Sequence, residues 1–286
     1  MSLAHLAGRQ YGPFAVSTSR ERVAAYVAST GDLPSRWTEA IPPSYAAVAL
    51  FAVAPALLLS EDVGAYSRIL MHADQRFAWH ARLAVGAPLA VSGRVAKVRE
   101  RGGMSFVSFV AEVLDGSGKA VVESESTFIM SGGAPPAGSD EQPEPEVLHR
   151  GENEHPGRVP LPGLGESLVP LAKSASRADL VTYAAASGDF NPLHWDHASA
   201  RAAGLPRVVV HGLLLSAWML QAATRHTDEE HPALEATFRF KSPVLAGQAA
   251  SISGHVSGKE RGTALLDLSL LTHGDTSVTA RMTVVE

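Results

Sequence analysis

Residues 186–214 read ASGDFNPLHWDHASARAAGLPRVVVHGLL and connect two segments that favour helices. Before this stretch, Ser176-Arg177-Ala178-Asp179 has the spacing of a capping box, in which the serine and aspartate side chains satisfy backbone donors at a helix start. We expect that helix to end near Gly188. Within the stretch, Ala198–Ala203 should form a short helix. The segment Gly212–Thr224, which begins at the end of this stretch, has the length and composition of a buried helix.

Four strands are expected after the buried helix, near residues 234–241, 248–258, 263–272 and 276–285. Alternating apolar residues and glycine-containing turns indicate them. A long apolar helix followed by antiparallel strands indicates a sheet wrapped around a helix. The predicted fold class is therefore α+β, with this arrangement present twice in the chain.

The duplication is visible in two pairs of similar segments. YVASTGDLPSRW (26–37) resembles YAAASGDFNPLHW (183–195), and LAVGAPLAVSGRV (83–95) resembles VLAGQAASISGHV (244–256). The segments occur in the same order in both halves. This order indicates a duplicated domain.

We therefore divide the chain into residues 1–130, 131–160 and 161–286. The middle part is rich in proline, glycine and acidic residues and shows no apolar periodicity, which is typical of a linker. The two outer parts are expected to share one continuous sheet as a pseudo-dimer. Apolar helices at 44–59 and 212–224 should pack on its concave side.

Composition excludes several classes of function. The chain has 286 residues, 45% of them hydrophobic, and a net charge of −5, without the basic stripe that nucleic-acid binding requires. It contains no cysteine, so disulfides and thiol catalysis are excluded. The N-terminus does not resemble a secretory signal, and the apolar run Tyr45–Leu59 is too short to cross a bilayer. We expect a cytoplasmic protein that does not insert into membranes, and a homodimer is possible.

A motif in the second half carries a family resemblance. Its residues are Gly188-Asp189-x-Asn191-Pro192-x-His194-x-Asp196, then Gly204-x-Pro206 and His211-Gly212. This pattern resembles the MaoC-like dehydratase and R-specific enoyl-CoA hydratase (hydratase 2) family. That family has the hot-dog fold, and chains with two such units are called double hot-dogs.

The first half resembles the family only as a degraded copy. Asp32 remains, but Leu33-Pro34-Ser35-Arg36-Trp37 replaces the Asn-Pro-x-His run, and Pro43-Ser44 stands where the second half has His211-Gly212. The resemblance thus implies a degenerate N-terminal hot-dog domain and one active site per chain, in the second half.

The implied reaction is the R-specific hydration of trans-2-enoyl thioesters, or the reverse dehydration of (3R)-hydroxyacyl thioesters. Such chemistry needs groups that hold and deprotonate water and donors for the enolate oxygen. Asp189 and His194 are the only close acid and imidazole in the motif, and we expect them to hold one water between them. Which of the two takes the proton stays open. Gly212 would offer a free N–H at the positive end of the helix dipole to the thioester oxygen.

Four more residues are candidates for substrate binding. Asn191 could contact substrate or only order its loop, and His211 could contact substrate or only orient the loop. Arg239 and Lys241, two positions apart on one face of a strand, could bind the phosphates of coenzyme A or of an acyl carrier, or could simply be solvated charges. Asp196 is expected to cap the short helix.

No metal and no redox cofactor is expected. His194, Asp196, His197 and His211 are ligand types, but the sequence has no HExxH or comparable ligand spacing. Coenzyme A or an acyl carrier would enter only as part of the thioester substrate.

Two other functions are compatible with a hot-dog fold. An acyl-CoA thioesterase usually places an acid on or near the central helix, and Gly212–Thr224 contains none. A non-catalytic acyl-thioester-binding protein would not require Asp189 and His194. The length and branching of the acyl chain, the carrier and the direction of the reaction stay open.

Overall fold

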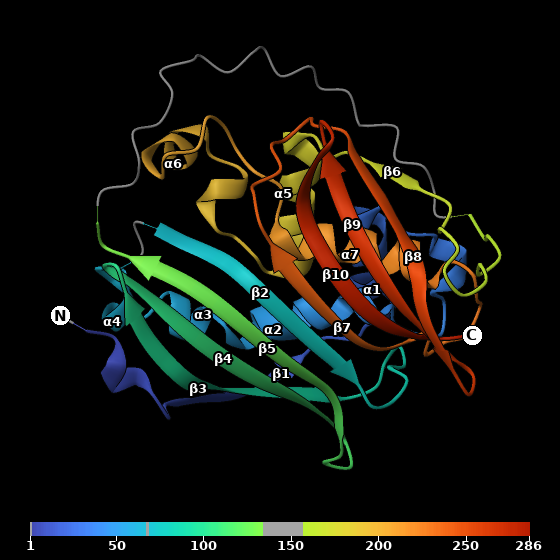
Figure 1. The fold of residues 1–286 in the computed structure, drawn as a ribbon. Coiled ribbons are helices and arrows are strands. Elements are labelled where there is room, and N and C mark those ends of the chain that lie inside the picture. The colour runs from blue at the N-terminus through green and yellow to red at the C-terminus, as the bar shows by residue number, and fades with distance from the viewer. Residues whose placement is uncertain (1, 67–68, 134–156) are drawn as a thin grey trace.

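A computed structural model describes residues 2–66, 69–133 and 157–286 (Figure 1). Ten strands form one sheet in the order β1-β3-β4-β5-β2-β7-β10-β9-β8-β6. The strands are β1 (Gln10–Val16), β2 (Ile69–Trp79), β3 (Leu89–Arg101), β4 (Met104–Asp115), β5 (Ala120–Ser131), β6 (Leu171–Lys173), β7 (Ala233–Phe240), β8 (Ala250–Glu260), β9 (Thr263–Thr272) and β10 (Asp275–Val285).

The strand order confirms that the two halves repeat one design. From its outer edge to the centre of the sheet, the first half has the order β1-β3-β4-β5-β2. The second half has the corresponding order β6-β8-β9-β10-β7 from the opposite edge. β2 and β7 pair antiparallel at the centre through five residue pairs, from Asp74↔Arg239 to Ala78↔Glu235. The expected continuous sheet is therefore present, and the β2–β7 pair is the seam between the halves.

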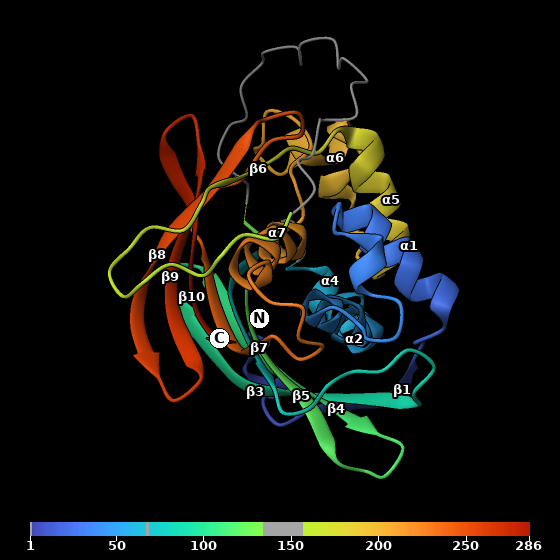
Figure 2. The same cartoon turned by 90° about the vertical axis from the view of Figure 1, so that its right-hand side faces the viewer.

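The helices lie on the concave side of this sheet (Figure 2). They are α1 (Arg20–Thr30), α2 (Ala46–Val53), α3 (Pro55–Leu58), α4 (Glu61–Gly64), α5 (Arg177–Ser187), α6 (His197–Ala202) and α7 (Gly212–Thr224), with short 3-10 turns η1 (Ala4–Leu6), η2 (Pro34–Arg36), η3 (Pro43–Tyr45) and η4 (Pro192–His194). No helix among the described residues is long and apolar enough to cross a membrane.

The two central helices follow the sequence closely. α7 begins and ends at the predicted residues, and all of it except Gly212 is buried. The apolar segment 44–59 forms a 3-10 turn and two helices, divided before Pro55, because proline has no N–H to continue the backbone hydrogen-bond pattern. The predicted linker 131–160 lies largely outside the described residues.

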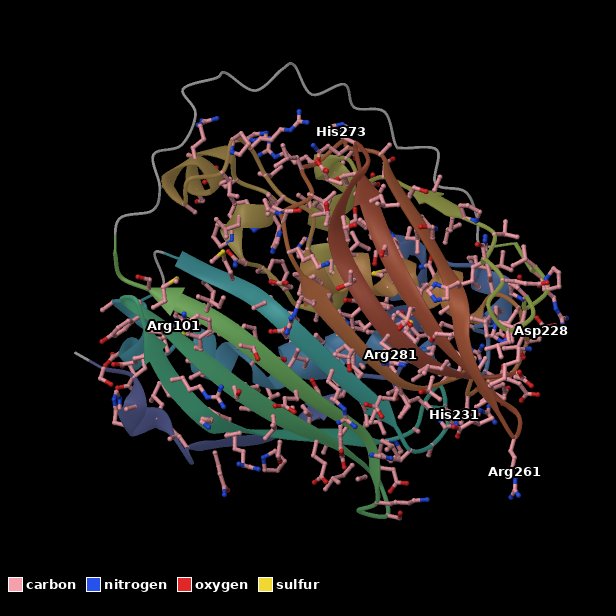
Figure 3. All side chains as sticks on the ribbon, viewed as in Figure 1. Arg101, Asp228, His231, Arg261, His273 and Arg281 are labelled. Atoms are coloured by element: carbon pink, nitrogen blue, oxygen red, sulfur yellow. The ribbon has the colours of Figure 1, made fainter. Side chains whose placement is uncertain are left out.

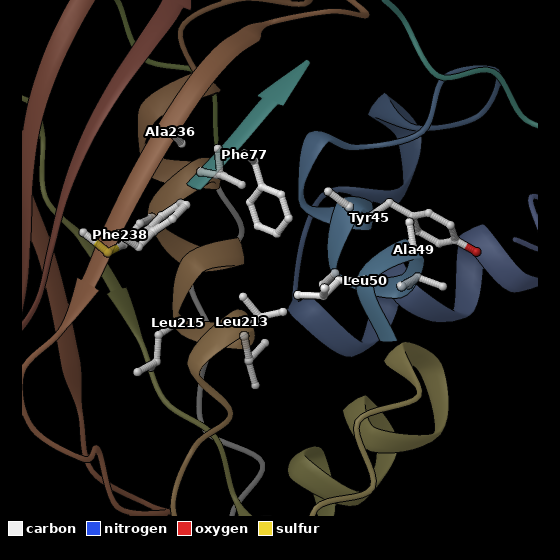
Figure 4. Close-up of a cluster of buried hydrophobic side chains, with 14 of the residues drawn as sticks. Tyr45, Ala49, Leu50, Phe77, Leu213, Leu215, Ala236 and Phe238 are labelled. Atoms are coloured by element: carbon white, nitrogen blue, oxygen red, sulfur yellow. The ribbon is translucent and has the colours of Figure 1, made fainter. Parts of the chain in front are cut away.

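The core fills the space between the helices and the inner face of the sheet. Phe77 of β2 and Phe238 of β7 lie across the seam in a cluster that also contains Leu50 of α2 and Leu213 of α7 (Figure 4). All four are at most 2% exposed. The outer face carries polar and charged side chains such as Arg281 of β10 (Figure 3). Each half thus completes the core of the other.

Candidate active site

Asp189 follows directly after α5. Ser176 caps this helix and forms the predicted capping box with Asp179. Gly188 ends the helix with φ of 88°, a left-handed conformation that suits glycine. The side chain of Asp189 is buried, and its Oδ1 accepts a hydrogen bond from the N–H of Asn191 at 3.3 Å. The second carboxylate oxygen, Oδ2, faces His194.

His194 is held in one orientation by the backbone. It ends the 3-10 turn η4, and its Nδ1 lies 2.8 Å from the carbonyl oxygen of Val209. A carbonyl only accepts, so Nδ1 carries a hydrogen and, in the neutral ring, Nε2 carries the lone pair. Nε2 lies 4.0 Å from Oδ2 of Asp189. This distance is too long for a direct hydrogen bond, and it leaves the two groups facing one space.

The surroundings of Asp189 favour its neutral form. Burial raises the pKa of the carboxyl group, while His194 and the N–H of Asn191 act in the opposite direction. Desolvation penalises a charge that has lost water without gaining a full set of partners. A buried carboxyl group with a raised pKa beside an imidazole is typical of a general acid–base site.

The ring of His211 packs against the ring of His194. The two rings stack with centroids 3.7 Å apart. The ring of Tyr183, from α5, also lies against His211, with centroids 4.8 Å apart. His211 Nε2 is 3.2 Å from the carbonyl oxygen of Asp189. Burial lowers the pKa of His211 well below its usual value, and His194 acts in the same direction. A neutral His211 therefore links the Asp189 backbone to the His194 ring.

Gly212 is the first residue of α7. The side chain of His211, at the N-cap position, makes no capping hydrogen bond. The first N–H groups of a helix have no partner within the helix, and they carry the positive end of its dipole. A Cβ atom at Gly212 would lie 3.3 Å from the Phe240 ring, so glycine lets this ring pack closely against the start of the helix.

Three potential metal-ligating atoms meet in this site, one each from Asp189, His194 and His211, all within 4.8 Å of one another. Asp196 and His197 do not join them, because Asp196 caps α6 and Nδ1 of His197 accepts from the Val208 N–H. One nitrogen of each ring is already committed to a backbone carbonyl, Nδ1 of His194 to Val209 and Nε2 of His211 to Asp189. The other nitrogen of each ring and the carboxylate of Asp189 remain.

The remaining predicted residues have separate places. Asn191 is the N-cap of η4, and its side chain accepts from the N–H of Leu193. This bond gives it a role in ordering the loop.

The structure places Arg239 and Lys241 at the surface, and their assignment to substrate binding stays a prediction. Arg239 is exposed and pairs with Asp74 across the seam at 2.9 Å. It alternates along β7 with Phe238 and Phe240, which face the interior, so its side chain is on the outer face. Lys241 follows the strand and is also exposed.

The corresponding turn of the first half is closed. Asp32 is buried, and both its oxygens are occupied, by the N–H of Leu33 at 2.7 Å and by Nε1 of Trp37 at 3.0 Å. Arg36 takes the place of His194 at the end of the 3-10 turn, but its guanidinium donates to the carbonyl of Thr224. The carboxylate of Asp32 is thus bonded to its own turn and does not face an imidazole.

Three aromatic residues near the site were not singled out from the sequence. Tyr183 supports His211, Phe240 lies against Gly212, and Phe51 of α2 lies 3.6 Å from where a Cβ of Gly188 would be. Tyr183 did give a signal, because it is repeated as Tyr26 in the first half. The other two depend on how the halves pack together.

Comparison with known families identifies both halves. Residues 163–270 match the MaoC like domain, and residues 5–124 match the FAS1-like dehydratase domain region.

Several enzymes are similar to the chain. It is 30% identical to the (R)-specific enoyl-CoA hydratase of Aeromonas caviae over 107 residues, which cover 36% of the chain and 80% of the relative. It is 26% identical to 3-hydroxyacyl-thioester dehydratase X of Mycobacterium tuberculosis, covering 80% of the chain and 74% of the relative. Peroxisomal multifunctional enzyme type 2 of Drosophila melanogaster is 29% identical over 73% of the chain, which spans only 35% of that enzyme.

Solved structures show the same fold. A MaoC-like dehydratase superposes with a TM-score of 0.83 at 20% identity, covering 99% of both chains. A Mycobacterium tuberculosis protein described as having a double hotdog fold superposes with a TM-score of 0.65 at 16% identity, covering 98% of this chain and 96% of that one. The α+β double hot-dog is thereby confirmed. With its motif, its fold and its hydratase and dehydratase relatives, the chain belongs to the MaoC-like dehydratase family of lyases.

Proposed function

We propose that this chain catalyses the R-specific hydration of trans-2-enoyl thioesters, or the reverse dehydration of (3R)-hydroxyacyl thioesters. The observation that carries the proposal is the 4.0 Å separation between Oδ2 of Asp189 and Nε2 of His194, two buried atoms that face each other without bonding. A water at about 2.8 Å from each atom would satisfy both. The relatives named as hydratase and dehydratase support the same reaction.

The bound water would be the reacting one. Its oxygen forms a bond to C3 of the enoyl group, the C2–C3 π electrons move toward the thioester, and negative charge develops on the thioester oxygen. The N–H of Gly212 would stabilise that charge. One proton of the water passes to the Asp189–His194 pair and is returned to C2, which restores the carbonyl and leaves the pair as it started. The product is a 3-hydroxyacyl thioester.

Either member of the pair can take the proton. Asp189 accepts as a carboxylate, and neutral His194 accepts at Nε2, because its Nδ1 hydrogen is committed to Val209. The stacked His211 and the Val209 carbonyl keep the His194 ring in place. Coenzyme A or an acyl carrier protein would supply the thioester, and the reaction as written needs no metal or redox cofactor.

The proposal is tested by mixing purified protein with crotonyl-CoA and following the loss of enone absorbance. We expect turnover by the wild type, and a loss of about 10²–10⁴-fold in Asp189→Asn and in His194→Gln, the usual worth of positioned acid–base groups. Asp32→Asn is the matched control, because Asp32 is the equivalent residue of the closed half. Near-normal rates in a folded Asp189 or His194 variant would contradict the assignment.

A further inference from the structure

One histidine of the first half lies beside the candidate site of the second. His72 of β2 pairs across the strands with Phe128 of β5, and its ring is 4.9 Å from the Phe128 ring and 5.3 Å from the Phe240 ring. Phe240 in turn lies against Gly212. His72 is thus one aromatic ring away from the N–H that would hold the thioester oxygen.

One nitrogen atom of His72 makes no hydrogen bond within the fold. Its Nε2 is buried and has no hydrogen-bond partner among the described residues. Burial lowers the pKa of His72 to about 4, so the ring is neutral at pH 7. Leaving a buried polar atom without a partner destabilises the fold, and a phenylalanine or leucine would avoid that cost at this position.

The neighbouring polar side chains leave Nε2 of His72 without a partner, although Gln75 interacts with the His72 side chain. Gln75, on the same face of β2, accepts from Ser126 at 2.6 Å and donates to Ser124 at 2.9 Å. Gln75 and Ser126 are fully buried. These residues form a network within the sheet that uses the polar atoms of Gln75. Nε2 of His72 is the atom beside this network that has no partner among the described residues.

His72 as a whole is less tightly buried than the neighbouring Phe128. Phe77, Phe128 and Phe238 on the same inner face are at most 2% exposed, whereas His72 and Phe240 are only partly buried. The sealed core of the first half therefore ends at this pair of rings.

We propose that His72 is a specificity-determining residue that hydrogen-bonds a hydroxyl group on the acyl chain of the substrate, beyond C3. A hydroxyl both donates and accepts, so it suits either tautomer of the neutral imidazole. Phe128 and Phe240 on either side would pack against the methylene groups of the chain. This inference rests on the proposed function.

The test compares trans-2-octenoyl-CoA with its 5-, 6-, 7- and 8-hydroxy derivatives. In the wild type, at least one hydroxylated substrate should have the higher kcat/KM. His72→Leu should lower kcat/KM for that substrate by about tenfold, the worth of one uncharged hydrogen bond, and should leave octenoyl-CoA unchanged or improved. His72→Gln, which keeps a polar end, should retain part of the preference.

His80→Gln serves as the control, because His80 follows the same strand but is exposed and pairs with Glu123 at the surface. It should not alter the ratio between the substrates. A thermal melt should show His72→Leu to be at least as stable as the wild type, since it removes an unpaired buried nitrogen.

Three outcomes would overturn the inference. The wild type could show no preference for any hydroxylated substrate. His72→Leu could change kcat/KM equally for all substrates, which would place His72 against the shared pantetheine arm or in a purely structural role. Failure of the wild type to hydrate crotonyl-CoA or octenoyl-CoA would instead reject the proposed function itself, and the role of His72 with it.

Discussion

At the scale of single residues, Asp189 combines reactivity with a cost to stability. Burial raises its pKa, so the neutral acid is the form that the fold favours. A group with a raised pKa in the folded state contributes stability below its ordinary pKa and loses that contribution as the pH rises through the raised value. At pH 7 an ionised Asp189 therefore opposes folding, while its ionised form is the one that can accept a proton from water.

Asp189→Asn should accordingly raise Tm at pH 7 although it removes most activity, because the amide can keep the bond to the N–H of Asn191 without a charge. In the wild type, the acidic limb of the kcat/KM profile should have its midpoint above about 3.9, the ordinary aspartate value. Asp196→Ala provides the contrast, since it removes the cap of α6 and should lower Tm. A lower Tm for Asp189→Asn would show that the ionised carboxylate stabilises the fold.

The residue types of the motif allowed Asp189 and His194 to be selected from the sequence, but not their distance. Arg239 and Lys241 were selected as two charges on one face of a strand, without asking which face is buried. The alternation Phe238-Arg239-Phe240 contains that information, because two phenylalanines on one side of a strand indicate its inner face. His72 gave no such signal, because its neighbours Phe128 and Phe240 come from other strands.

At the scale of elements, the start of α7 would decide where the thioester oxygen is held in the proposed reaction. Its ends were predictable because a continuous apolar run follows His211-Gly212, and buried helices need such a run. The packing of Phe240 over Gly212 was not predictable, because it depends on how β7 crosses the helix start.

Gly212→Ala should reduce kcat/KM for enoyl thioesters while leaving the far-ultraviolet circular dichroism unchanged. The added methyl group would lie 3.3 Å from the Phe240 ring, a side chain that can shift slightly, whereas the thioester would lose its close approach to the backbone. Alanine also favours the helix more than glycine does. Wild-type kinetics in this variant would show that the glycine only shapes the entry to the helix.

At the scale of the whole molecule, the β2–β7 seam makes the two halves depend on each other. The internal repeat predicted the shared sheet, since each apolar helix needs a covering sheet. It could not predict which strands meet. The seam is reinforced on its outer face by Arg239 with Asp74 and by Arg76 with Glu235. This pairing gives Arg239 a structural role.

A fragment of residues 160–286 would expose the β7 edge and the apolar residues that the first half covers. An exposed strand edge pairs readily with another chain, so we expect the fragment to aggregate or to form homodimers through β7. Size-exclusion chromatography with light scattering measures this directly. A well-behaved monomer with full activity would contradict the dependence of each half on the other.

The stereochemistry of the product tests the central claim most directly. Asp189 and His194 would hold the water on one side while Gly212 fixes the thioester oxygen, so only one face of C3 is within reach. The measurement is the oxidation of the product of trans-2-enoyl-CoA hydration by an S-specific hydroxyacyl-CoA dehydrogenase. The account predicts a 3R alcohol, which this dehydrogenase leaves unoxidised; an S product, oxidised by it, would contradict the proposed function and the geometry of the site.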